Sequence, residues 1–183
     1  MIINLLTVEV IKRATHTKYT TCVYTGISNC INYGDIVSTA GGAGGIVANS
    51  QGMIVECSNE GEVKGTTSIG GIAAQASGYN MQLSKCVNNG EVKVSINGGG
   101  GIAGGVGMGA TLSECSNKGK VTAEPQTDED GNLVNVKIIG GIVGTVSQGG
   151  NVKACVNEPE ATIEAGTTQS VGGIAGYVRN GEV

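Results

Sequence analysis

A seven-residue pattern, Cys-x-Asn-x-Gly-x-Val, recurs along the chain and limits its possible folds more than any other feature of the sequence. Complete copies begin at Cys57, Cys86 and Cys115. Looser copies begin at Cys30 and Cys155, and the last of these has proline in place of the glycine. Because one unit of roughly 30 residues is too small to enclose a core of its own, this recurrence predicts units that stack upon one another.

A second pattern, Gly-Gly-Ile, alternates with the first without exception. Its copies lie at residues 44–46, 70–72, 100–102, 140–142 and 172–174. We therefore expect repeats over residues 27–183, with an insertion at about 124–136 in the longest interval. Residues 1–26 lack both patterns, and we expect them to form an irregular segment or a cap on the first repeat.

The spacing of apolar residues inside a unit predicts short strands. Cys57, Asn59, Gly61 and Val63 are two residues apart with polar residues between them, the period of a strand with one face turned inward, bent at its Asn and Gly. Ile54 lies three residues before Cys57, and this odd offset predicts a corner between them. Glycine-rich segments are expected to form further corners at positive φ. Each unit should thus hold two or three strands, and no unit shows a helical apolar period.

Stacked units of this kind predict an all-β fold, a single-stranded, right-handed parallel β-helix (β-solenoid) of about five rungs. Equivalent strands would lie about 4.8 Å apart, and the right hand follows from the usual handedness of parallel crossovers. Tyrosine is the only aromatic residue type, with 5 copies and no Phe or Trp, so the interior must be filled by small aliphatic side chains that suit a narrow lumen. A propeller blade needs four strands and about 40 residues, which these units do not provide.

The alternation of the two patterns resembles the GLUG motif, a repeat of bacterial surface and secreted proteins that include some immunoglobulin A protease-like ones. The Gly-hydrophobic-x-Gly core of that motif matches at residues 101–104, 141–144 and 173–176. Ala48 and Ala74 replace its last glycine in the other two copies. The family has no assigned reaction, so the resemblance implies a location and a shape more than a chemistry.

One cysteine from each unit should join an inward-facing column of stacked thiols: Cys30, Cys57, Cys86, Cys115 and Cys155. Parallel Cα–Cβ bonds suit a disulfide torsion poorly, so we expect buried free thiols, with disulfides as the alternative. A metal site is disfavoured, because no Cys-x-x-Cys pair exists and the chain has a single histidine. Cys22 lies outside the column and is the candidate for a reactive thiol.

One asparagine from each unit forms a second column: Asn32, Asn59, Asn88, Asn117 and Asn157. A buried carboxamide needs hydrogen-bond partners, and stacked copies can supply them to one another. We expect a structural ladder, with ligand recognition as the alternative.

The insertion contains a cluster of polar and acidic residues, Asp128, Glu129, Asp130 and Asn132. An EF-hand alignment lacks the carboxylates at its first and last positions, so a solvated turn is expected and weak calcium binding is the alternative. Binding residues are often carried by long excursions from a regular scaffold, which makes this segment the candidate ligand loop.

Outward-facing positions predict a column of charged residues at Asp35, Glu62, Glu91, Lys120 and Glu160, which we interpret as a solvated surface. No cofactor is expected. Gly99, Gly101 and Gly104 match the spelling of a dinucleotide-binding motif, but no helix follows them as that motif requires.

These observations predict a non-enzymatic protein, a structural or adhesive repeat module of a bacterial cell-surface or secreted protein. The alternatives are a module that binds carbohydrate or a host protein through the insertion, and a polysaccharide-degrading β-helix. A net charge of −4 argues against nucleic acid, and no apolar run is long enough to span a membrane. The expected partners are neighbouring repeats or domains of a longer chain. Because the sequence stops partway through a unit, end-to-end self-association is also expected.

Overall fold

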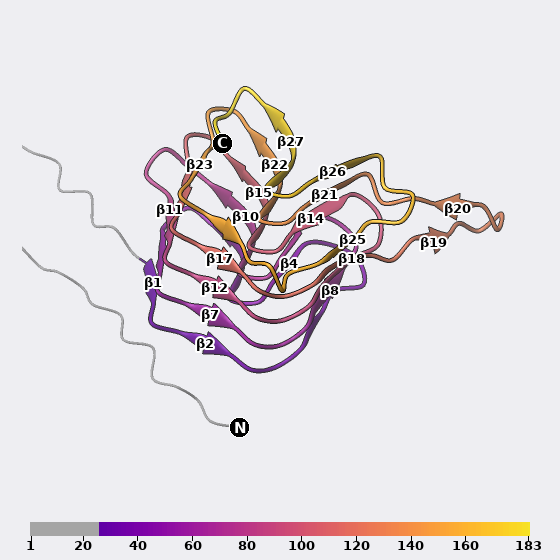
Figure 1. Cartoon of the computed structure of the whole chain (residues 1–183), viewed down its shortest axis with the longest axis horizontal. Helices are drawn as coiled ribbons and strands as arrows, with labels where there is room; N and C mark the ends of the chain where they lie inside the picture. Colours follow the sequence, from indigo (N-terminus) through magenta and orange to yellow (C-terminus); the bar gives the residue numbers. More distant parts are fainter. Residues whose placement is uncertain (1–25) are drawn as a thin grey trace, which may run out of the picture.

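The structure, a computed structural model, describes residues 26–183, which form an all-β parallel solenoid of about five turns (Figure 1). Each turn contributes one strand to each of five parallel sheets, which we name A to E in chain order. The predicted fold class is confirmed, but the expectation of two or three strands per unit is wrong, because each turn contains five short strands. The expectation for residues 1–26 lies outside the described residues except for Gly26, which belongs to the first strand.

The first three sheets form the first part of each turn. Sheet A consists of β1 (Gly26–Ser28), β6 (Met53–Val55), β11 (Gln82–Ser84), β16 (Thr111–Ser113) and β23 (Asn151–Lys153). Sheet B consists of β2 (Ile31–Asn32), β7 (Ser58–Asn59), β12 (Val87–Asn88), β17 (Ser116–Asn117) and β24 (Val156–Asn157). Sheet C consists of β3 (Ile36–Val37), β8 (Val63–Gly65), β13 (Val92–Val94), β18 (Val121–Ala123) and β25 (Ile163–Glu164).

Two further sheets complete the turn. Sheet D consists of β4 (Ala43–Gly44), β9 (Ile69–Gly70), β14 (Gly98–Gly100), β21 (Ile138–Gly140) and β26 (Ser170–Gly172). Sheet E consists of β5 (Val47–Ser50), β10 (Ala73–Ser77), β15 (Ala103–Gly107), β22 (Val143–Ser147) and β27 (Ala175–Arg179). The Cys-x-Asn-x-Gly-x-Val segment therefore spans two sheets, B and C, rather than one bent strand.

The pairing register places the repeat residues in line. Asn88 pairs with Asn59 of the preceding turn and with Asn117 of the following one. Gly70 pairs in the same way with Gly44 and Gly100. Equivalent residues of both patterns thus stack along the solenoid axis, as the repeat predicts.

The corner between sheets A and B is made by one residue in the left-handed region of φ in every turn. Their φ values lie between 51° and 54°, and the residues are Asn29, Glu56, Lys85, Glu114 and Ala154. This corner falls between the apolar residue of sheet A and the cysteine, where the odd spacing predicts it. None of these residues is glycine, although glycine adopts this conformation at lower cost.

The glycines of the two repeat patterns are required for a reason other than positive φ. They are absent from the residues with positive φ, whereas Gly109 and Gly149, in glycine-rich segments outside the two patterns, adopt that conformation as expected. A Cβ atom at Gly90 would instead overlap the carbonyl oxygen of Gly61 in the preceding turn, and one at Gly119 would overlap that of Gly90. Glycine is required here because consecutive turns approach closely.

The fifth copy of the first pattern departs from the others by two residues. Ile163 pairs with Val121, so Ile163, and not Ala161, takes the position of the pattern's valine. The side chain of Asn157 donates to the carbonyl of Ala161, whereas Asn117 donates to Gly119. Proline has no N–H and adds ring atoms where a Cβ would already collide, so the chain takes a longer path around Pro159. The prediction that this corner differs is confirmed, and the alignment of Glu160 with Lys120 is wrong.

The interior contains two hydrophobic clusters. The first lies between sheets A and E and includes Ile54, Leu83 and the cysteines, while the second lies between sheets C and D and includes Val92 and Ile139. No side chain in these clusters is aromatic, and the large ones are Ile, Leu, Val and Met81, as the composition predicts. Residues 26–183 contain no helix of the length and apolarity needed to cross a bilayer.

The insertion forms a hairpin of β19 (Gln126–Thr127) and β20 (Leu133–Val134), the one antiparallel pair among the described strands. Figure 1 shows the hairpin extending sideways from the stack beyond sheets C and D. Val136, which follows it, is fully buried in the second cluster, so the chain has already rejoined the core at that residue.

Candidate functional site

The asparagine column is a continuous hydrogen-bonded ladder. The side-chain amide of Asn59 donates to the side-chain oxygen of Asn88 at 2.9 Å, and Asn88 donates to Asn117 at the same distance. The bonds from Asn32 to Asn59 and from Asn117 to Asn157 extend the ladder through all five turns. The five asparagines thus form one column whose amides bond to one another.

Each carboxamide of the ladder also holds the turn that follows it. Asn88 Nδ2 donates to the carbonyl oxygen of Gly90 at 2.8 Å, and Asn59 donates to Gly61 at 2.7 Å. Asn59, Asn88 and Asn117 are fully buried, and no buried side-chain nitrogen or oxygen among the described residues lacks a partner. The three buried amides are thus fixed by hydrogen bonds that leave no group for a ligand.

The two repeat patterns meet inside the lumen. A Cβ atom at Gly71 would overlap the carboxamide carbon of Asn88, and one at Gly101 would overlap that of Asn117. The second glycine of Gly-Gly-Ile therefore packs directly against the asparagine of the next turn. This contact narrows the interior of the solenoid between the two hydrophobic clusters. It gives a physical reason why the two patterns alternate in the sequence.

The five predicted cysteines also form one column, and all are free thiols. The Cys57 thiol donates to the carbonyl of Val55 at 3.3 Å, and its backbone N–H donates to the sulfur of Cys86 at 3.4 Å. Cys86 repeats both contacts, with the carbonyl of Ser84 and the sulfur of Cys115. The thiols thus act as small core side chains. Cys22, the candidate for a reactive thiol, lies outside the described residues.

The pKa of the Cys115 thiol is raised by its hydrogen bonds with the thiols of Cys155 and Cys86 and by its burial. Hydrogen bonding to Cys86 together with burial also raises the pKa of Cys57. A thiolate at either position would face a backbone carbonyl oxygen without a proton to donate to it. These sulfurs are therefore poor nucleophiles at neutral pH.

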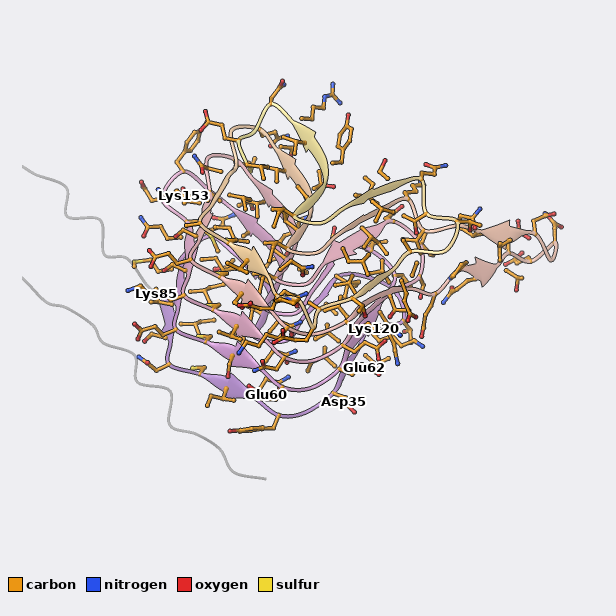
Figure 2. The ribbon with its side chains drawn as sticks, in the orientation of Figure 1. Asp35, Glu60, Glu62, Lys85, Lys120 and Lys153 are labelled. Atoms are coloured by element: carbon orange, nitrogen blue, oxygen red, sulfur yellow. The ribbon has the colours of Figure 1, made fainter. Side chains whose placement is uncertain are left out.

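The charged column between sheets B and C is partly as predicted. Figure 2 shows Asp35, Glu62 and Lys120 following one another up the stack. Lys93 of sheet C lies beside this column and binds Glu62 at 2.6 Å and Glu91 at 3.4 Å, so neighbouring carboxylates share one ammonium group. The hydrogen bond with Glu62 raises the pKa of Lys93. These half-buried pairs lie at the surface of the stack. Ion pairs near water contribute little to stability.

The acidic cluster of the insertion forms the tip of the hairpin. Asp128 Oδ1 accepts backbone N–H bonds from Asn132 at 2.7 Å and from Asp130 at 3.0 Å, and the Asn132 amide donates to Asp128 Oδ2 at 3.2 Å. These hydrogen bonds, first of all those from Asn132, lower the pKa of Asp128. The Asp128 carboxylate thus holds the turn through hydrogen bonds. This arrangement agrees with the interpretation of the cluster as a solvated turn. Glu129 lies in the same exposed tip.

A shallow groove on the outer face of sheet E is the feature that sequence reasoning missed. Its volume is about 280 Å³, and its lining comes from four consecutive turns. The lining residues are Asn49, Gln75, Ser77, Gly105, Val106, Gly107, Met108, Thr145, Ser147 and Gln148. The sequence signal that could have revealed the groove is glycine at two outward positions, Gly105 and Gly107, of one turn, where the neighbouring turns have residues with side chains.

The described residues contain no cluster of three or more His, Cys, Asp or Glu side chains that could hold a metal ion. Glu62, Glu91, Glu124 and Glu164 are in ion pairs with lysines. No family model, curated protein or solved structure matches this chain.

Proposed function

We propose that this chain is a non-catalytic structural or adhesive repeat module of a bacterial cell-surface or secreted protein. The observation that supports this function is the continuous carboxamide ladder, which joins all five turns through their side chains. A stack of this kind transmits load along its axis through parallel sheets and resists bending, which suits a spacer or a stalk. The polar buried groups serve the fold itself.

The proposed location rests on the resemblance of both patterns to GLUG repeats. The structure adds a physical reason for that pattern, because the Asn of one segment packs on the glycine of the other. The proposed partners are neighbouring repeats or domains in a longer chain, since stacked turns present ladder ends to whatever follows them. The top turn ends with the carboxamide of Asn157, which could continue the ladder.

Mechanical unfolding of the whole chain between terminal handles tests this function. Consecutive ladder residues are 29 residues apart in the middle turns, so a released turn should lengthen the chain by about 100 Å. We expect a series of such steps, and Asn88→Ala should lower the force of the middle ones. Extension without resistance would overturn the structural role. The appearance of new reducing ends in polysaccharide mixed with the protein would overturn the non-catalytic assignment.

A second candidate function is binding of carbohydrate or a host protein through the insertion. The observation that favours it is the projection of the hairpin from the stack, with a depression of about 130 Å³ at its base that Gln126 and Lys64 help to line. Replacing residues 128–132 by Asn-Gly tests it, because this dipeptide closes a two-residue hairpin between β19 and β20. The variant removes Asp128, Glu129, Asp130 and Asn132 but keeps the buried Val136. A binder would lose its ligand, and a spacer would be unaffected.

A further inference from the structure

The groove on sheet E exists because one turn lacks side chains there. Gly105 pairs with Gln75 of the turn below and with Thr145 of the turn above, so the three residues occupy one outward column. Gly107 lies in the next outward column, where it pairs with Ser77. Because β15 carries no outward side chains here, its buried backbone lies lower than its surroundings, the Gln75 amide covers Gly105, and the longer side chains of neighbouring turns form the walls of the groove.

Gln75 is held in place in this groove. Its Nε2 atom donates to Ser68 Oγ at 3.0 Å, and its amide lies across Gly105, with oxygen and nitrogen 2.5 and 2.7 Å from the position of a Cβ there. A carboxamide has two N–H donors and an acceptor oxygen, so one bond to Ser68 leaves it able to donate and accept further bonds. The groove therefore has an oriented polar group at its centre.

The chemistry of the lining selects for an uncharged ligand rich in hydroxyl groups. Every polar side chain around the groove is an amide or a hydroxyl, and none carries a charge. These groups donate and accept hydrogen bonds with equal ease, as sugar hydroxyls do. An extended peptide is a poor fit, because the middle strands of sheet E are paired on both sides and offer no free edge for an added strand.

The shape of the groove suits a linear ligand. It crosses four turns, a length of about 14 Å for a spacing of about 4.8 Å between neighbouring strands. Tyr177 continues the column of Gly105 one turn above Thr145, and Tyr79, 89% exposed, packs on Gly109 beside Met108. Exposed rings at the two borders of a polar groove provide apolar faces on which a sugar ring can stack.

We propose that the groove on sheet E binds a linear, uncharged glycan, with Gln75 as the central hydrogen-bonding residue. This inference rests on the adhesive role proposed above and names its ligand class. It places the glycan site on the face of the solenoid instead of in the insertion.

Titration of the full chain with cellohexaose, xylohexaose and mannohexaose, followed by amide NMR shifts and calorimetry, tests the proposal. We expect at least one of the three to bind and to shift amides of β10, β15 and β22. Gln75→Ala should weaken that binding roughly tenfold, the effect of losing one or two hydrogen bonds. Gln82→Ala is the matched control, because Gln82 is exposed on sheet A, and it should leave binding unchanged.

Gly105→Thr provides a second variant, which tests the space of the groove. It restores the side chain found at Thr145. The atoms nearest its Cβ belong to the end of the Gln75 side chain, which can turn away by giving up its bond with Ser68, so the fold should tolerate the change. It should fill the groove and abolish binding while the melting temperature stays close to that of the wild type. A folded Gly105→Thr protein that binds the hexasaccharide as well as the wild type would overturn the proposal.

Three other outcomes would also overturn the proposal. The first is the absence of amide shifts with all three hexasaccharides at 10 mM, which is about the weakest binding that such a groove could use. The second is loss of binding in the variant with the shortened hairpin, and the third is a preference for oligogalacturonate that depends on Arg179. Arg179 is the charged residue one turn above Ser147, outside the groove lining. Stepwise mechanical unfolding without any glycan binding would leave the structural role standing and remove this inference alone.

Discussion

The first and third turns carry the same pattern residues in different surroundings. A Cβ at Gly90 in the third turn would overlap the carbonyl oxygen of Gly61, whereas the nearest described atom to a Cβ at Gly34 in the first turn is 3.7 Å away. Asn88 is fully buried, but Asn32 is partly exposed and has a described ladder partner, Asn59, on one side only. The pattern is therefore imposed by the neighbouring turns more than by the local conformation of the chain.

Gly90→Ala should produce the largest loss of stability. The added methyl group would lie inside the van der Waals radius of a backbone oxygen that cannot move without shifting the turn below. We expect the free energy of unfolding to fall by about 4 kcal/mol or more. Chemical denaturation followed by circular dichroism measures this loss.

Gly34→Ala is the matched control for that variant. It makes the same substitution at the same pattern position, and the Cβ would have ordinary contact distance to Asn32 Oδ1. Its effect should stay within about 0.5 kcal/mol. Equal losses in the two variants would show that glycine is needed for local conformation, which contradicts the stacking explanation.

Asn88→Ala should have the second-largest effect. It removes the donor to Gly90 and to Asn117 and leaves the amide of Asn59 without its ladder acceptor. Buried polar groups without partners are costly, so we expect a loss of about 3 kcal/mol. Asn32→Ala, which breaks the ladder at its solvated end, should cost about 1 kcal/mol. A larger loss for Asn32→Ala than for Asn88→Ala would contradict the ladder's role in the interior.

The sequence was sufficient to predict the solenoid, because two alternating patterns with constant internal spacing have one simple arrangement in space. It was insufficient for the number of strands per turn, since strands of two residues such as β7 have no recognisable period. The two-residue shift around Pro159 depends on a collision between turns, which no local rule contains. The groove depends on the absence of side chains at Gly105 and Gly107, which resemble the structural glycines of the repeat in the sequence.

The Cys115 thiol predicts a dependence of stability on alkaline pH. Because the pKa of Cys115 is raised in the folded protein, the unfolded chain releases this proton first as the pH rises past about 9. The stabilisation that the protonated Cys115 thiol gives the folded state is complete below that pH. Above it, the free energy of unfolding falls by about 1.4 kcal/mol per pH unit. Denaturation at pH 8 and pH 10 measures the loss.

Cys115→Ala supplies the reference for the pH experiment. It removes the Cys115 thiol and leaves every other ionisable side chain in place. The variant should be less stable at pH 8 by about 1 to 2 kcal/mol, because a buried atom is lost, but its stability should fall less steeply up to pH 10. Parallel pH curves for the two proteins would show that Cys115 ionises equally in the folded and unfolded states.

Replacement of the corner residue Glu114 should give the smallest effect, and it is the one change expected to stabilise the protein. Glu114 has a φ of 53° and an exposed side chain, so its conformation costs energy that no contact of the pattern recovers. Asparagine tolerates this region better, and Asn29 already occupies the same corner in the first turn. We expect Glu114→Asn to raise the free energy of unfolding by about 0.5 kcal/mol, measured by denaturation. Glu124→Asn, in ordinary backbone conformation beside Lys64, should give no gain. If neither variant is more stable than the wild type, the neighbouring turns determine the conformation of the corner, as they determine the need for glycine in the pattern. Local backbone strain at Glu114 would then play no part.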